Sequence, residues 1–167
     1  IRNFLGDRIA IRNSTLELVF LRRELGSPFD LNIDGRLQLF LGSGTMPWRR
    51  TAASGATIAI GTDIGAGDEW LIPRVLNDCY KVHMSEHGDR STALEPAQLL
   101  FLGTLAGARA LDQERVFGNF DTGKDADFVI VDPAAQPGFA LALAAAVDGG
   151  PESHLFTLLM GMREASI

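Results

Sequence analysis

The sequence predicts an α/β fold, because short apolar runs typical of strands alternate with amphipathic stretches typical of helices. The clearest strand is residues 57–62, which Asp63 and a glycine-rich turn follow. Helices are predicted next, at about residues 70–87 and over 95–111, where Pro96 suits the first helical position. Strands that alternate with helices in this way are typical of an α/β unit.

Three elements are predicted before this strand. A capping box at residues 14–17 starts a helix over 15–25. The apolar run at 39–41 indicates a short strand, and Pro47 suits the start of a helix over 48–54. The sequence thus places helices on both sides of a short strand in its first third.

A β element and two helices complete the chain. Residues 116–120 and 127–131 are predicted strands, joined by a turn at 121–124. The tail is predicted to form helices over 139–147 and 151–163.

Two of the predicted helices carry patterns that indicate packing faces. The 70–87 helix has one apolar stripe, made of Leu71, Val75, Leu76, Cys79 and Val82. The 95–111 helix has a face of small residues that predicts close packing on a neighbour: Gly103, Ala106, Gly107 and Ala110.

Composition limits the class of protein. At 167 residues the chain is long enough for one domain with a core, and its formal charge of −6 gives no indication of a nucleic-acid or anionic-membrane surface. The longest apolar stretch, residues 99–111, is too short to span a bilayer and contains Arg109. Cys79 is the lone cysteine, which excludes an internal disulfide and is compatible with a reducing compartment. We therefore expect a cytoplasmic protein.

Polar groups at strand ends are the candidate site. Asp63 directly follows the 57–62 strand, and a carboxylate at the rim of a sheet can bind a metal ion or take a proton from a metal-bound water. The alternative is an aspartate that satisfies a tight βα turn. A second glycine loop, residues 42–44, could bind an anion together with Arg49 and Arg50, or form an ordinary turn before a helix.

Histidines supply a second candidate. His83 and His87 lie four residues apart on a predicted helix, so both face the same way and could bind a metal. The competing interpretation is two solvated histidines near a helix C-terminus, where positive charge is favourable. His154 is expected to be a packed or surface residue of the tail helix.

Several segments together resemble one family. Similarity to the guanine deaminases of the amidohydrolase superfamily is carried by residues 40–44 (FLGSG), 47–50 (PWRR) and 60–67 (IGTDIGAG). Residues 118–132 resemble the closing strands that many members of this superfamily share, so this motif does not choose among substrates.

The resemblance implies a fold. It indicates the C-terminal part of an amidohydrolase-type (β/α)8 barrel plus strands of the small composite β-domain beside it. On this basis the chain divides into an N-terminal segment without a counterpart, the last barrel units, the return strands of the β-domain, and C-terminal helices: residues 1–38, 39–112, 113–133 and 134–167.

The resemblance also implies an activity, the zinc-dependent hydrolytic deamination of guanine to xanthine and ammonia. In the family a His-x-His pair, two further histidines and an aspartate hold the zinc, and a glutamate moves protons. Asp63 matches the aspartate, which would both bind zinc and take a proton from the attacking water. Asp63 is therefore the predicted catalytic and metal-binding residue.

The sequence departs from this family in two respects that bear on activity. It contains no His-x-His, and residues 39–167 are too few for a barrel, which takes about 200–250 residues. We therefore expect the metal-binding front half of the barrel to be missing from this chain. We also expect this chain alone not to deaminate guanine. The sequence leaves open whether the chain is an enzyme by itself.

Two alternatives stay open. The chain could be a non-catalytic remnant, or a fragment that needs a partner to complete the barrel. It could also be another amidohydrolase that acts on an aminopurine or a triazine. Because a cut barrel exposes strand edges, a homo-oligomer is a further expectation.

Overall fold

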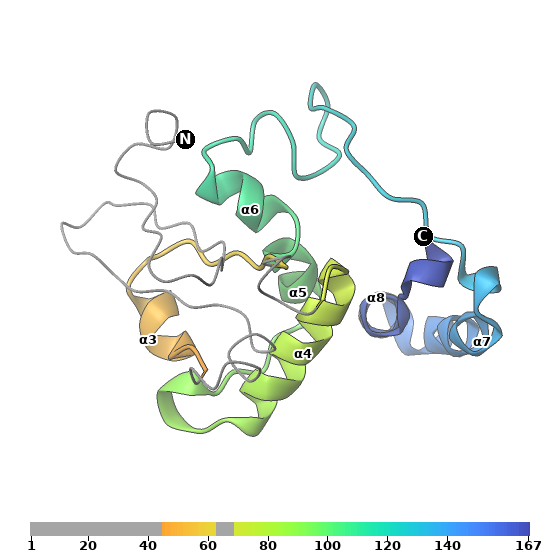
Figure 1. Cartoon of the computed structure of the whole chain (residues 1–167), viewed down its shortest axis with the longest axis horizontal. Coiled ribbons are helices and arrows are strands. Elements are labelled where there is room, and N and C mark those ends of the chain that lie inside the picture. Colours follow the sequence, from red (N-terminus) through yellow and green to blue (C-terminus); the bar gives the residue numbers. More distant parts are fainter. Residues whose placement is uncertain (1–44, 63–68) are drawn as a thin grey trace.

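The computed structural model describes residues 45–62 and 69–167, which form helices and connecting segments (Figure 1). The α-helices in these ranges are α3 (Trp48–Ala53), α4 (Ile72–Ser85), α5 (Pro96–Leu102), α6 (Leu105–Ala110), α7 (Pro137–Ala146) and α8 (Gly150–Gly161). Short 3-10 turns accompany them: η2 (Gly88–Arg90), η3 (Pro133–Ala135), η4 (Val147–Gly149) and η5 (Glu164–Ser166). The expected helix at 15–25, the expected strand at 39–41 and Asp63 lie outside the described residues. No helix in the described ranges is both long and apolar enough to cross a bilayer.

Helices α3 and α4 form where the sequence predicts them. Helix α3 ends at Ala53 with Ser54 as its C-cap, and the next residue, Gly55, has a φ of +76°, which favours glycine. In α4 the predicted apolar stripe is the buried face, since Val75, Leu76 and Cys79 are at most 2% exposed. The helix is two residues shorter at each end than the predicted 70–87.

An apolar core joins α4, α5 and α8. Leu76 of α4 and Leu99 of α5 are 2% and 0% exposed, and Leu159 of α8 is 3% exposed. The rings of Tyr80 and Phe156 meet edge to face, with their centroids 5.1 Å apart, which fixes α8 against α4. Figure 1 shows α8 beside α4 and α5, with α7 on its far side.

The predicted 95–111 helix is two helices in the structure, which corrects the prediction. Helix α5 begins at Pro96 as predicted, and a capping interaction that the sequence analysis did not name joins Glu95 and Gln98. The chain then leaves helical geometry at Thr104, where φ is −135° and ψ is −97°. The break follows Leu102, whose carbonyl accepts a hydrogen bond from the Ile60 N–H at 3.0 Å instead of continuing a helical ladder.

The predicted strand at 57–62 is not a strand in the structure. Its central residues, Ile58, Ala59 and Ile60, are buried at 3–9% exposure, as expected for a core strand. A strand, however, is defined by hydrogen bonds to neighbouring strands. The backbone bond described for this run goes to the end of α5, so the run is extended and buried but is not part of a sheet within the described residues.

The predicted strands at 116–120 and 127–131 are also absent from the described structure. The turn between them forms as predicted, with the Lys124 N–H donating to the Asp121 carbonyl at 3.2 Å. One further bond, from the Asp125 N–H to the Val116 carbonyl at 2.7 Å, closes the loop. The segment runs away from the helices before it reaches α7 (Figure 1), so no neighbouring strand among the described residues extends the pairing.

The two tail helices confirm the prediction. Helices α7 and α8 lie side by side and are joined by η4, and Gly150 adopts a φ of +85° at the junction. The Phe139 ring of α7 packs directly on Gly161 of α8, where a Cβ would lie 2.6 Å from the Phe139 Cε2. Glycine is therefore what permits this close approach of the two helices.

Candidate functional site

The chain on the upstream side of Asp63 is fixed by burial. Ile58 and Ile60 are 9% and 7% exposed and belong to the core that also contains Leu102. The hydrogen bond from the Ile60 N–H to the Leu102 carbonyl holds the run against α5. Asp63 itself, the predicted catalytic and metal-binding residue, lies outside the described residues, so its role stays a prediction.

The chain on the downstream side is fixed by Glu69. Its Oε1 accepts hydrogen bonds from the Trp70 and Leu71 N–H groups, both at 3.0 Å, and its Oε2 lies 2.5 Å from the Arg74 Nε. Glu69 is only 7% exposed, so these partners compensate for the burial of its charge. A carboxylate at this position also complements the N-terminal end of the α4 dipole.

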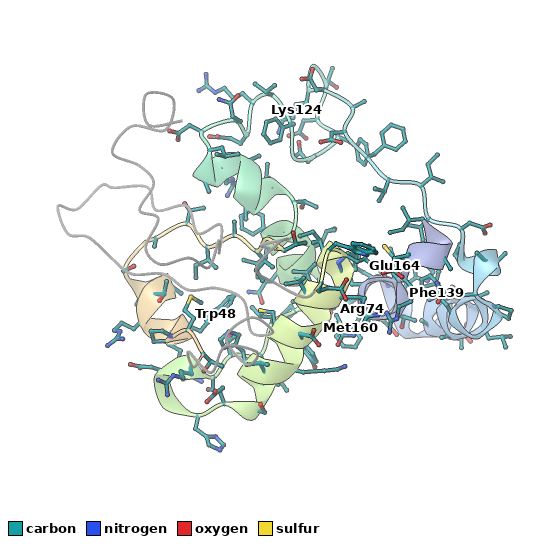
Figure 2. The ribbon with its side chains drawn as sticks, viewed as in Figure 1. Trp48, Arg74, Lys124, Phe139, Met160 and Glu164 are labelled. Atoms are coloured by element: carbon teal, nitrogen blue, oxygen red, sulfur yellow. The ribbon has the colours of Figure 1, made fainter. Side chains whose placement is uncertain are left out.

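Trp70 and Glu164 form a long-range contact at the same place. The Trp70 indole Nε1–H donates to the Glu164 Oε1 at 2.8 Å, across 94 residues of sequence. Figure 2 shows Glu164 and Arg74 close together where the start of α4 meets the C-terminal segment. The beginning of α4 is therefore held by Glu69 from its own chain segment and by Glu164 from the C-terminus.

Residues 47–50 (PWRR) serve packing in the structure. Trp48 is buried, and its ring meets the His83 ring edge to face with centroids 5.0 Å apart. The Arg49 Nε donates to the Ser91 carbonyl at 3.0 Å and its Nη2 to the Ser91 Oγ at 3.2 Å. The Arg49 guanidinium is thus engaged by the loop after α4, which weakens the prediction that it binds an anion; residues 42–44 lie outside the described residues.

His83 corrects the prediction of a solvated histidine pair. His83 is 2% exposed, and its Nδ1 lies 2.6 Å from the Arg90 carbonyl oxygen, whereas His87 is exposed. Burial lowers the pKa of His83, and the Arg90 carbonyl and the charge of Glu86 oppose this effect only in part. Four-residue spacing puts both histidines on one helix face, but α4 turns the first into the core while the second lies beyond the end of the helix.

The described residues do not form a metal centre by themselves. Across residues 45–62 and 69–167, no group of three or more His, Cys, Asp or Glu side chains is close enough together to hold a metal ion. His154 is half-buried on α8, in agreement with the expected packed or surface residue. Asp63 lies outside the described residues, so the absence of such a group does not bear on a metal bound at Asp63.

Sequence reasoning missed the residues that hold the start of α4. Glu69 carried a signal, since an acidic residue just before a helix is typical of a helix N-terminus. Its partner Arg74 lies five residues further on, in the first turn of α4. Glu164 carried none, because no local pattern relates a glutamate near the C-terminus to Trp70.

Comparison with known proteins defines the class first. Residues 8–160 match the family described as "Amidohydrolase family", so the chain belongs to the amidohydrolase family. The family and its solved structures imply a TIM-barrel-type fold, and its members generally bind a metal ion.

Within this family the chain is similar to guanine deaminases. It is 39% identical to the guanine deaminase of Escherichia coli (strain K12) over 99 residues, which are 59% of this chain and 22% of that protein. It is 40% identical to a probable guanine deaminase of Deinococcus radiodurans over 106 residues, which are 62% of this chain and 24% of that protein.

A solved structure supports the same grouping. The structure of E. coli guanine deaminase superposes on 81% of this chain with a TM-score of 0.69 and 31% sequence identity, and the chain covers 30% of that structure. The chain thus spans less than a third of the length of these relatives, and the predicted resemblance to guanine deaminases is confirmed over that share.

Proposed function

We propose that this chain contributes Asp63 to the active site of a zinc-dependent guanine deaminase, which hydrolyses guanine to xanthine and ammonia. The observation that carries the proposal is the buried run before Asp63, fixed to α5, in a chain whose relatives are guanine deaminases. The downstream anchor at Glu69 supports it, because both ends of the segment that carries Asp63 are then attached to the core.

The chemistry of this reaction assigns a task to Asp63. A water molecule adds to the amino-bearing carbon of guanine, the C–N bond breaks, and the amino group leaves as ammonia after it gains protons. The Asp63 carboxylate would accept the proton that the water loses as it attacks, which is general-base catalysis. A zinc ion bound beside Asp63 would lower the pKa of this water.

The proposal includes a requirement for further polypeptide. The chain has three histidines and no His-x-His, so the family's metal ligands are not available within these 167 residues. We propose that the isolated chain does not deaminate guanine and that its segment functions when the remainder of a barrel is present. A cytoplasmic location is part of the proposal and is supported by the cysteine content, since a single cysteine, Cys79, cannot form an internal disulfide.

A chimera tests this proposal directly. The segment of E. coli guanine deaminase that matches this chain would be replaced by the matching segment of this chain, and guanine deamination would be followed by absorbance. We expect an active, metal-containing chimera, because the E. coli part supplies the barrel that this chain lacks. Asp63→Asn in the chimera is expected to reduce kcat by at least about a hundredfold, since the proton acceptor is lost.

Asp127→Asn is the matched control, because it removes a carboxylate of the same chemistry from an exposed loop. This variant is expected to leave kcat unchanged. A folded, metal-loaded chimera without guanine deamination, or an Asp63→Asn variant as active as its parent, would contradict the proposal.

The substrate is tested in the same chimera. Turnover of guanine but not of adenine or a triaminotriazine is expected. Preference for one of the other two would favour the alternative that this chain comes from a different aminopurine or triazine amidohydrolase.

A further inference from the structure

The indole of Trp70 is held in place by hydrogen bonding, not by burial. Trp70 is 66% exposed, which is unusual for a side chain of this size. Its Nε1–H nevertheless has a defined partner, the Glu164 Oε1 at 2.8 Å. Its backbone N–H is bound separately by Glu69. Trp70 is therefore fixed at both its main chain and its side chain.

Glu164 belongs to a segment that is itself well anchored. The hydroxyl of Ser166, a residue only 1% exposed, donates to the Arg163 carbonyl at 2.7 Å and accepts from the Arg163 N–H at 3.1 Å. The Ser166 carbonyl accepts from the Asp132 N–H at 2.7 Å. Because these bonds hold η5 from both sides, the Glu164 carboxylate is presented to Trp70 from a fixed position.

The end of α8 adds a further attachment. The Arg163 Nη1 donates to the Met160 carbonyl at 3.0 Å and to the Met162 carbonyl at 2.7 Å, so the guanidinium caps the end of α8. The Met160 carbonyl also accepts from the Asn77 Nδ2 of α4 at 3.4 Å. The C-terminal segment is thus attached at two places. Asn77 binds it within α4, and Trp70 binds it just before α4 begins, where Figure 2 shows Glu164 and Arg74 together.

We propose that Glu164 is a positioning residue for the segment that carries Asp63. It acts through Trp70, which lies seven residues after Asp63 and directly downstream of residues 63–68. By fixing the Trp70 indole, Glu164 restrains the point at which that segment joins α4. The importance of this restraint for catalysis rests on the proposed function. The restraint of Trp70 by Glu164 does not depend on that function.

The first test is the indole signal. In a 1H–15N spectrum of the full 167-residue chain, the two tryptophans give separate indole N–H resonances, and Trp70→Phe identifies that of Trp70. Glu164→Ala is expected to shift the Trp70 resonance toward that of a solvated indole. Glu164→Gln keeps an acceptor oxygen and is expected to restore the wild-type position.

The second test is amide hydrogen exchange of residues 69–74, where the described bonds to Glu69 and Glu164 lie. Glu164→Ala is expected to speed their exchange about three- to tenfold, the range that the loss of one hydrogen bond predicts. Glu164→Gln is expected to stay near the wild type, and Trp70→Phe to reproduce the effect of Glu164→Ala. Glu152→Ala, which removes an exposed glutamate from the first turn of α8, is the matched control and is expected to change nothing in this region.

Three outcomes would overturn the proposal: an unchanged Trp70 resonance in Glu164→Ala, unchanged exchange of residues 69–74, or a uniform rise in exchange over all of α4 and α8. The last outcome would show a general loss of stability instead of positioning. Because neither measurement depends on deamination, an inactive chimera would count against the proposed function alone.

Discussion

His83 shows how one residue can be placed correctly on a helix by sequence and still be wrongly assigned to solvent. The sequence predicts the helix and the shared face of His83 and His87, but the direction of that face depends on α3. Trp48 covers the His83 ring, and the Arg90 carbonyl accepts from its Nδ1–H. These partners favour a neutral imidazole with its proton on Nδ1.

This burial predicts a pH-dependent stability. Because the pKa of His83 is lowered in the folded chain, the unfolded chain binds a proton that the folded chain does not as pH falls below about 6.5. Full stability is therefore expected above this pH, with a loss of at most about 1.4 kcal/mol per pH unit from His83 as the solution is acidified. Urea unfolding between pH 5 and 8 measures this slope.

His87→Gln is the control for this prediction, since it removes an exposed histidine four residues away. It should leave the slope as in the wild type. His83→Gln should lower stability at pH 8 and flatten the slope between pH 5.5 and 7. An equal slope in wild type and His83→Gln would show that His83 is not the responsible group.

At the scale of elements, the small-residue face of α5 and α6 is confirmed in part. Ala106 and Ala110 are buried, and Gly103 lies against α4, where an added Cβ would meet the Ile72 Cγ2 at 2.9 Å and the Leu76 Cδ1 at 3.0 Å. Gly107 has nothing within 4 Å of such a Cβ. The same face of small residues thus contains one glycine, Gly103, that has little room for a side chain, and another, Gly107, that has room for one.

Gly103→Ala is expected to destabilise the chain by about 1–2 kcal/mol, because the new methyl group must displace the partly buried Ile72 and the buried Leu76 of α4. Gly107→Ala is the matched change, and we expect it to be neutral or to stabilise by up to about 1 kcal/mol, since alanine is the better helix former in open space. Thermal and urea unfolding of the two variants measures the difference. Equal stabilities would contradict the close packing of α5 on α4.

Helices were predictable here because their signals are local. Pro96 with the Glu95–Gln98 capping interaction, the apolar stripe of α4 and Gly150 each act within a few residues. The break at Thr104 was not predictable, because it accompanies a hydrogen bond between Leu102 and the distant Ile60. A local pattern cannot contain the partner that ends a helix.

At the scale of the whole molecule, the predicted strands are absent from the described residues for a related reason. A strand needs a neighbour, and residues 57–62 and 127–131 have none among the described residues. Asp63 was recognised by its place after an apolar run and by its family motif, and it lies outside the described residues. The contact between Trp70 and Glu164 joins residues 94 positions apart, so only the folded structure reveals it.

The exposed segment between α6 and α7 leads to a prediction for the whole molecule. Phe128, Val129 and Ile130 are 57%, 64% and 75% exposed, and Phe120, at 80% exposed, lies with its ring 6.2 Å from that of Phe128. Consecutive apolar residues in extended backbone are typical of a segment that pairs with another chain. We expect the isolated 167-residue chain to self-associate at micromolar concentrations through this segment.

Ile130→Lys is expected to shift the chain toward monomer, because a charge in a β-prone run opposes pairing with a second copy. Sedimentation velocity over a concentration series measures the shift. Leu141→Lys places the same charge on α7 at a comparably exposed apolar position, 73% exposed, and is expected to leave self-association unchanged. If the wild-type chain is a monomer throughout the series, or if both variants dissociate it equally, then the 116–131 segment is not the surface through which the chain associates. The distinction matters because a chain that needs further polypeptide to complete a barrel should expose its unpaired strands, whereas a chain that folds to completion alone should not.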